Sequence, residues 1–343
     1  MNIHVKALLP VFGALALAIL PGEAVELRLK WQPGKRYVFD NTADSSMKMP
    51  LPGQGLIETK GRMVMRIHNE VSPHEKGVRV SQSYDSLRMR QEMQGLVMEF
   101  DSSDPSKGGG LLGTVLKPLI ETRFAAIYDK KGKVVGTEGL DKVQGADQLG
   151  MGKQELEAMA RQSSEFLPGR DVKPGDTWNS EVDLPMGELG GKVTIDYTLK
   201  LENVVEQEGR KIARISFSGK MKEAEETEEG EVLKTEVKEA TGMMLFDIDL
   251  GQPLELSTTT LLETGLPAGI PQAEGAPGKM PIKSVSVQKL VGVEELKKEA
   301  SGGKDDSRTK PKGKVPAETR EEKKARRKAR RAKKREAEEA KPE

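Results

Sequence analysis

The sequence contains no cysteine among its 343 residues. Without thiols it has no disulfides, no cysteine-ligated zinc and no acylated lipoprotein cysteine. A secreted eukaryotic protein of this size usually carries disulfides, so an exported chain without them fits a bacterial envelope or secreted protein. Aromatic residues make up only 4% of the chain. A sugar-cleaving cleft usually presents aromatic platforms, so this shortage argues against a glycosidase.

The signatures of catalysis are missing as well. The chain has no G-x-S-x-G elbow, and its Gly-rich stretch at 107–111 lacks the G-K-[ST] of a phosphate-binding loop. His68 and His74 stand close to two glutamates, but two arginines share the predicted strand face of His68 and would repel a cation. We therefore predict a protein that is not an enzyme, with no catalytic residue, no metal site and no cofactor. A hydrolase whose carboxylates converge from distant strands is the alternative.

Residues 1–24 have the features of a secretory signal peptide. Lys6 precedes an apolar run from Leu8 to Leu20, and Gly22 and Ala24 offer the small residues of a cleavage site. The run is too short to span a bilayer comfortably, so we expect no transmembrane span after cleavage. The predicted location is the periplasm or the outside of the cell. An uncleaved anchor or a core helix is the alternative.

A Pro-Gly landmark occurs twice. The segment Lys30–Tyr37 is echoed by Asp171–Trp178, and each copy leads into alternating strands joined by a turn with glycine. Each proline fixes φ and each glycine permits the next bend, which is typical of turn chemistry. Duplication of a module and coincidence between two meandering sheets are both open at this point.

Alternation of apolar and polar residues predicts long antiparallel strands. The short turns between them disfavour parallel units, which need long crossovers. Helical spacing of apolar residues predicts helices at 111–123 and 153–166. The predicted strands are 25–29, 37–49, 62–71, 78–89, 192–202, 210–218, 232–245 and 254–262, with one closing strand near 285–289.

The predicted fold class is α+β and predominantly antiparallel β. Two similar long-stranded sheet modules, each able to carry a packed helix, precede a disordered or helical basic tail. The predicted divisions are a signal peptide at 1–24, module 1 at 25–146, module 2 at 147–298 and the tail at 299–343.

Methionine is abundant in the first module. In the predicted strand 62–71, Met63, Met65 and Ile67 face one way, and Met89 belongs to the partner strand. Methionine is polarizable and flexible, so it suits adaptable apolar binding surfaces. These four residues are the candidate ligand face for an acyl chain. Ordinary core filling, where aromatics are scarce, is the alternative.

The tail is strongly basic. Residues 301–343 hold 17 Lys/Arg and 9 Asp/Glu, a net charge of +8, so the rest of a chain of net +1 carries about −7. The tail has no apolar face for membrane insertion, but it suits anionic lipid or envelope polymer. No aromatics interleave it, so no specific nucleic acid is expected. The candidate polyanion-binding residues are Lys323, Lys324, Arg326, Arg327, Lys328, Arg330, Arg331, Lys333, Lys334 and Arg335.

An acidic hairpin offers the tail a partner inside the chain. Six glutamates surround Gly230 between Glu223 and Glu231. A solvated turn is the simpler interpretation, and a contact with the basic tail is the alternative.

Three short motifs resemble a family of exported bacterial proteins known only as a domain of unknown function. The matching segments are Leu27–Tyr37, Val172–Trp178 and Phe246–Leu254, and the resemblance covers most of residues 25–291. It implies a β-rich, envelope-associated protein, and it brings no catalytic residues to carry over. The basic tail lies outside it.

The leading functional hypothesis is a non-catalytic binding or scaffold protein of the envelope, which holds an apolar or amphiphilic ligand on a curved sheet. The alternatives are a polyanion-tethering protein that acts through its tail and the hydrolase described above.

Overall fold

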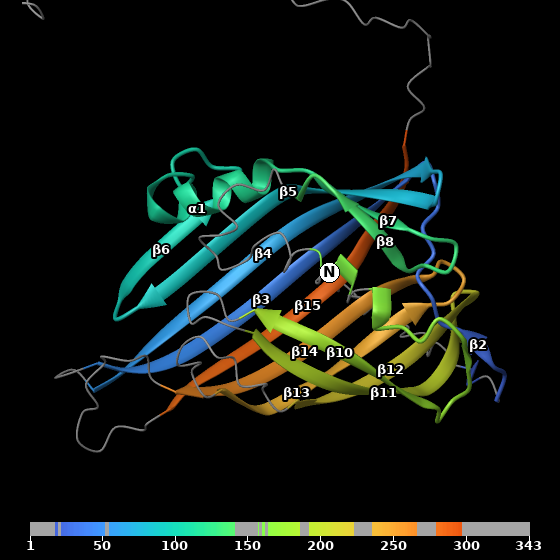
Figure 1. Ribbon diagram of the computed structural model, residues 1–343. Helices are drawn as coiled ribbons and strands as arrows, with labels where there is room; N and C mark the ends of the chain where they lie inside the picture. Colours follow the sequence, from blue (N-terminus) through green and yellow to red (C-terminus); the bar gives the residue numbers. More distant parts are fainter. Residues whose placement is uncertain are drawn as a thin grey trace, which may run out of the picture. The chain divides into compact units, whose positions relative to one another are not determined.

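The computed structural model describes residues 18–19, 22–51, 55–140, 157, 160–161, 164–185, 192–222, 235–265 and 279–296. The chain divides into two compact units, Met1–Lys297 and Lys298–Glu343, and all described residues belong to the first. They form a 13-stranded sheet and a separate two-stranded one (Figure 1). Every pairing is antiparallel, and the predicted fold class is confirmed.

The strands are long and mostly contiguous in sequence. The first half contributes β3 (Lys35–Leu51), β4 (Gly55–His74), β5 (Gly77–Met93), β6 (Leu96–Asp101), β7 (Phe124–Tyr128) and β8 (Val134–Glu138). The second half contributes β10 (Thr177–Pro185), β11 (Lys192–Gln207), β12 (Arg210–Met221), β13 (Thr235–Asp247), β14 (Gln252–Gly265) and β15 (Lys279–Glu295). The short strands are β1 (Ala18–Ile19), β2 (Val25–Glu26) and β9 (Asp171–Val172).

The two halves repeat one pairing order. Strands β3, β4, β5, β7 and β8 pair in sequence, and β10, β11, β12, β13 and β14 pair in the same way. The Pro-Gly landmarks are equivalent in detail, because the Gly34 amide donates to the Val71 carbonyl at 2.8 Å and the Gly175 amide to the Leu201 carbonyl at 2.7 Å. Both glycines have positive φ, which explains why glycine stands there. The predicted boundary between the modules falls outside the described residues and stays a prediction.

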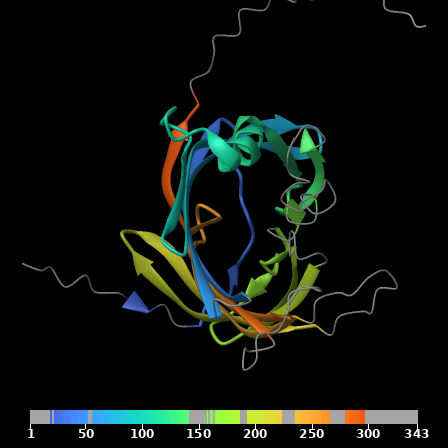
Figure 2. The same ribbon diagram turned by 90° about the vertical axis from the view of Figure 1, so that its left-hand side faces the viewer.

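Strand β15 makes the two halves one sheet. Its residues from Lys279 to Lys289 pair with β14, and those from Ile282 to Glu295 pair with β3. The sequence predicted only a short closing strand, whereas the structure has 17 residues. The sheet is strongly curved (Figure 2).

Helix α1 (Gly110–Glu121) lies against one end of the sheet. Its Leu116 is buried with Leu87 and Phe100, and Met65 and Met89 pack against this cluster. Pro118 is tolerated in the last turn of the helix. The second predicted helix is partly described, and residues 157, 160, 161, 164 and 165 are helical.

The N-terminal segment departs from the expected strand at 25–29. Only Val25 and Glu26 pair as a strand, with β9. Leu27 is fully buried in the core of β11, β12 and β13, and Trp31 packs edge-on against Tyr37. Sequence alternation identified the buried apolar positions of this segment. It did not show that the segment packs on the core of the large sheet and is not one of its strands.

Candidate functional site

The two faces of the sheet differ in charge. In β3, the alternate positions from Tyr37 to Met49 face one side, and the register carries this side across the neighbouring strands. From β11 through β15 and β3 to β5, the described residues at these alternate positions include no Asp, Glu, Lys or Arg between the strand ends. We call this side the uncharged face and the opposite side the charged face.

All four predicted ligand-face residues lie on the uncharged face. Met63 lies directly opposite Met89 on β5 and Ala43 on β3, and Ile67 lies opposite Phe39. Met65 packs in the cluster beneath α1. The methionines therefore lie on one face of the sheet, as the alternation of apolar and polar residues in the sequence predicted. All four side chains are partly exposed rather than fully buried.

The centre of the uncharged face is rich in hydroxyl groups. Ser284 and Ser286 on β15 lie opposite Thr260 and Thr258 on β14. All four are partly exposed and belong to none of the three hydrophobic clusters. Sequence reasoning missed this row. The alternation of Ser and Val at 284–287 was the available signal, but it does not reveal which face is covered.

A hydrophobic cluster lies on each side of the hydroxyl-rich centre of the uncharged face. One cluster gathers the alternate residues of β11, β12 and β13 with Leu27, Leu167 and Trp178. Another gathers Tyr37, Phe39 and their neighbours on β4, β5 and β7. Between the clusters, the middle of the uncharged face on β14, β15, β3 and β4 is partly exposed. Toward one end of the same strands, the residues of this face are buried: Ile57, Thr59, Leu262, Thr264 and Met280.

Tyrosines preserve the neutrality of this face. Burial raises the pKa of Tyr84, which lies opposite Ile67, and burial also raises the pKa values of Tyr37 and Tyr197. All three phenols therefore stay protonated and neutral at physiological pH. A charged ligand group placed among them finds no counter-ion, so the arrangement favours uncharged or aliphatic ligand parts.

The charged face carries matched ion pairs. Arg66 binds both carboxylate oxygens of Asp40 at 2.7 and 2.8 Å, and this hydrogen bonding lowers the pKa of Asp40. Lys289 pairs with Glu255 at 3.2 Å. His68 lies on this face with the arginines, as expected. In the described part of the chain no three His, Asp or Glu side chains are grouped to hold a metal ion.

Several sequence-predicted residues cannot be placed. The ten basic candidates from Lys323 to Arg335 and the hairpin Glu223–Glu231 lie outside the described residues. Most of the predicted signal peptide does so too. Within the described ranges no helix combines the length and apolarity that a membrane crossing requires.

Comparison with solved structures finds distant likenesses. A structure titled "Lipid-protein interactions in lipovitellin" is 13% identical over 78% of this chain, with a TM-score of 0.46, and the match spans 26% of that chain. The structure of DynF from the dynemicin biosynthesis pathway of Micromonospora chersina is 7% identical over 84% of this chain and 92% of its own, with a TM-score of 0.18. Neither score indicates a shared fold. A search of the curated proteins finds no match.

A comparison with family models identifies the family of this chain. Residues 75–252 match one model, which begins in the turn between β4 and β5 and ends at the first residue of β14. This span is just over half of the chain and includes the third sequence motif only in part. The chain belongs to the family of unknown function DUF6263.

Proposed function

We propose that this chain is a non-catalytic binding protein that holds an apolar or amphiphilic ligand against the uncharged face of its curved sheet. The observation that carries the proposal is the partly exposed centre of that face, where methionine and hydroxyl side chains lie between two packed clusters. A wholly structural face would be covered throughout, because exposed apolar surface costs free energy in water.

The methionines suit an aliphatic ligand. Met63 and Met89 lie opposite each other, and both have unbranched side chains that adapt to a chain of variable shape. Each methylene group that a ligand buries contributes about 0.8 kcal/mol. A chain of sixteen to eighteen methylenes therefore supplies about 13–14 kcal/mol, and the half that remains after ordering corresponds to a dissociation constant of roughly 10 μM.

The serine and threonine row suits the polar end of such a ligand. Ser284, Ser286, Thr258 and Thr260 each offer a hydroxyl that both donates and accepts hydrogen bonds. The row adjoins β3, whose other neighbour β4 carries Met63. An ester, amide or hydroxyl group can be satisfied there without bringing a charge to the uncharged face.

Export places this activity in the periplasm or outside the cell. The proposal rests on the apolar run from Leu8 to Leu20, the small residues after it and the absence of cysteine from the whole sequence. In that setting an envelope lipid is the available amphiphile. A scaffold role without ligand is the competing form of the same proposal.

The test compares two adjacent residues on opposite faces. Met63→Glu places a carboxylate on the uncharged face, whereas Val64→Glu places one on the charged face, where Val64 is 36% exposed. Binding of a fluorescent fatty-acid analogue is measured by titration for wild type and both variants. We expect Met63→Glu to weaken binding at least tenfold, since a carboxylate there lacks a partner, and Val64→Glu to leave it unchanged.

Circular dichroism and thermal melting show whether each variant is folded. Met63→Ala, which removes apolar contact without adding charge, provides a milder second probe. Equal binding by wild type and both Met63 variants, or no binding by wild type, would contradict the proposal.

A further inference from the structure

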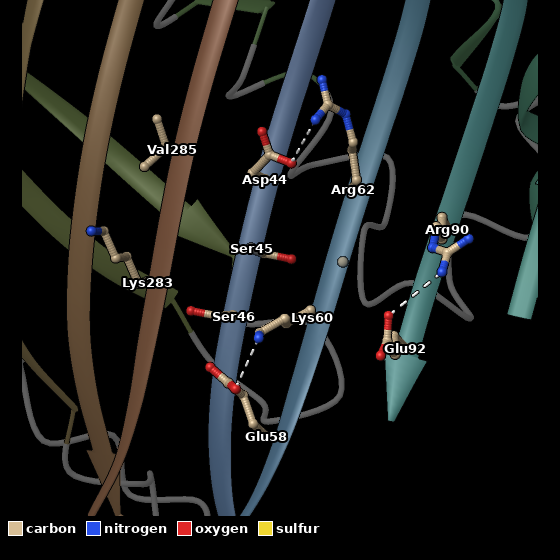
Figure 3. A pocket seen from close by; sticks show the side chains of 11 residues that line it. Asp44, Ser45, Ser46, Glu58, Lys60, Arg62, Arg90, Glu92, Lys283 and Val285 are labelled. Atoms are coloured by element: carbon tan, nitrogen blue, oxygen red, sulfur yellow. Dashed lines mark ion pairs between the residues drawn. The ribbon is translucent and has the colours of Figure 1, made fainter. Parts of the chain in front are cut away.

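A hollow of about 420 Å³ lies on the charged face, across β15, β3, β4 and β5 (Figure 3). Its lining combines the short residues Ser45, Ser46, Gly61 and Val285 with four basic side chains (Lys60, Arg62, Arg90 and Lys283) and three carboxylates (Asp44, Glu58 and Glu92). We call it the charged hollow. Its charged side chains project from the face opposite the methionines, although Ser45 and Gly61, which also line it, occupy positions of the uncharged face.

The strand register places two ammonium groups beside one hydroxyl. Ser46 lies directly opposite Lys283 on β15 and directly opposite Lys60 on β4. Directly opposite residues have Cβ atoms about 4.5–5.5 Å apart, and their side chains project to the same face. The Ser46 hydroxyl is thus flanked on both sides by lysines long enough to reach over it.

The adjacent row holds two like charges. Arg62 on β4 lies directly opposite Arg90 on β5, and Asp44 lies on the other side of Arg62. Like charges directly opposite each other destabilise a sheet. Four basic side chains therefore share two neighbouring rows with the carboxylates of Asp44 and Glu92, and Glu92 lies directly opposite Lys60 and 3.6 Å from Arg90. Positive charge remains in excess, and an anion between the basic side chains relieves their repulsion.

Two of these four cations have no hydrogen-bonded carboxylate partner in the part of the chain that the structure describes. Arg62 is 3.7 Å from Asp44, too far for a hydrogen bond, whereas Arg66 on the same strand face binds Asp40 at 2.7 Å. The Lys283 side chain forms neither a hydrogen bond nor an ion pair with any part of the chain that the structure describes.

The other two cations have closer partners. Lys60 is 3.1 Å from Glu58, and Arg90 is 3.0 Å from Glu99. These pairs are exposed, so they are weak and readily exchanged. Lys283 therefore supplies the unpaired positive charge of the hollow, and Arg62, which is only loosely paired with Asp44, lies in the adjacent row.

We propose that the charged hollow binds a small oxyanion, the carboxylate or phosphate group of a soluble organic molecule, above Ser46. Lys283 and Lys60 approach the anion from either side, the Ser46 hydroxyl donates from below, and Arg62 closes the adjacent row. The carboxylates of Asp44 and Glu58 at the margin repel a long polyanion, so the site selects a ligand with a single anionic group. Ion pairs with basic residues and a hydroxyl donor are the usual means of holding such groups.

The test uses isothermal titration calorimetry at low salt with three ligands: glycerol 3-phosphate, lactate and glycerol. We expect binding of one or both anions, which distinguishes phosphate from carboxylate, and no binding of glycerol. Lys283→Gln should weaken binding of the preferred anion about tenfold, as loss of one charge-assisted contact does. Lys289→Gln is the matched control, because Lys289 is on the same face of β15 and pairs with Glu255 at 3.2 Å.

Two results overturn the proposal. One is the absence of anion binding by the wild type. The other is equal weakening by Lys283→Gln and Lys289→Gln, which indicates attraction to general surface charge. Fatty-acid binding is measured on the same Lys283→Gln protein, so failure here leaves the test of the uncharged face intact.

Discussion

At the scale of single residues, two turns between paired strands each depend on the hydrogen bonds of one aspartate side chain. Asp247 is fully buried, and its Oδ1 accepts the amides of Asp249 at 3.1 Å and Leu250 at 2.9 Å. Asp129 accepts the amides of Lys131 and Lys133 in the equivalent turn of the first half. Both aspartates are therefore turn residues whose carboxylates accept amides of their own turn.

Replacing Asp247 with alanine should destabilise the fold by about 3 kcal/mol, because two amides lose their acceptor inside the protein. Asp247→Asn keeps an acceptor oxygen and should cost about 1 kcal/mol. Urea unfolding followed by circular dichroism measures both. Equal stability of the alanine variant and wild type would show that the turn does not rely on this carboxylate.

Substitutions at two glycines distinguish the free-energy cost of backbone strain from the cost of steric overlap. Gly132 and Gly175 both have positive φ, but a Cβ on Gly132 would lie 2.3 Å from the Leu29 carbonyl oxygen, and one on Gly175 would meet open space. Gly175→Ala should cost about 1 kcal/mol from φ alone. Gly132→Ala should cost clearly more. Thermal melts of the two variants compare them, and equal melting temperatures would contradict the close approach of Leu29.

At the scale of elements, α1 holds two of the four ligand-face candidates in place. Leu116 is buried against Leu87 and Phe100, with Met65 and Met89 beside it. Leu116→Ala should destabilise the protein by about 2–4 kcal/mol. It should also increase the solvent exposure of both methionines, which chemical oxidation followed by mass spectrometry reports. Unchanged oxidation of Met65 and Met89 would show that α1 does not cover them.

An exposed charge network ties β13 to its neighbours. Hydrogen bonds from Lys238 and Lys279 lower the pKa of Glu236 from 4.5 to about 2, and Lys238 also pairs with Glu263 on β14 at 3.2 Å. Since the folded-state pKa is depressed, this contribution is present above pH about 4.5 and is lost as the pH falls toward 2. The side chains are exposed, so salt should weaken the effect.

The corresponding measurement is an NMR titration of the Glu236 carboxyl group at low and high salt. We expect a midpoint near 2 at low salt that moves upward at high salt. Glu236→Gln should remove the part of the acid sensitivity of unfolding that arises here. A midpoint near 4.5 at low salt would mean that the two lysines do not hold this carboxylate.

Local sequence patterns predicted most helices and strands, but few of the pairings between strands that are far apart in the sequence. The alternation at 192–202 identified β11, and the helical spacing at 111–123 identified α1. The pairing of β15 with β3 was missed, because it joins residues about 250 positions apart and only the folded sheet brings them together. The grouping of the methionines was predictable from alternation, whereas the charged hollow combines residues of four strands whose register no local pattern encodes.

At the scale of the whole molecule, function is expected in the regions where the two halves differ. The repeated pairing order and the matched Pro-Gly turns account for architecture. The hydroxyl row of the uncharged face and the charged hollow lie where the halves meet at β15, and the basic tail belongs to neither half. An acidic body with about −7 and a tail with +8 also predict separate roles for the two parts of the chain.

Deleting residues 299–343 should abolish retention on anionic envelope material while leaving ligand binding intact. Retention by the full chain should fall steeply with salt, because it depends on release of counterions. Sedimentation with anionic vesicles or isolated envelope polymer, at two salt concentrations, measures this. Retention of the truncated chain equal to that of the full chain would remove the tethering role of the ten basic residues.

The central claim is that the uncharged face holds an amphiphile. The most direct measurement is native mass spectrometry of the full chain purified gently from the cells that make it. We predict a bound species whose mass corresponds to a lipid or other amphiphile, and its loss in Met63→Glu but not in Val64→Glu. Repeated spectra of ligand-free wild-type protein, together with no uptake of added lipid, would contradict the account.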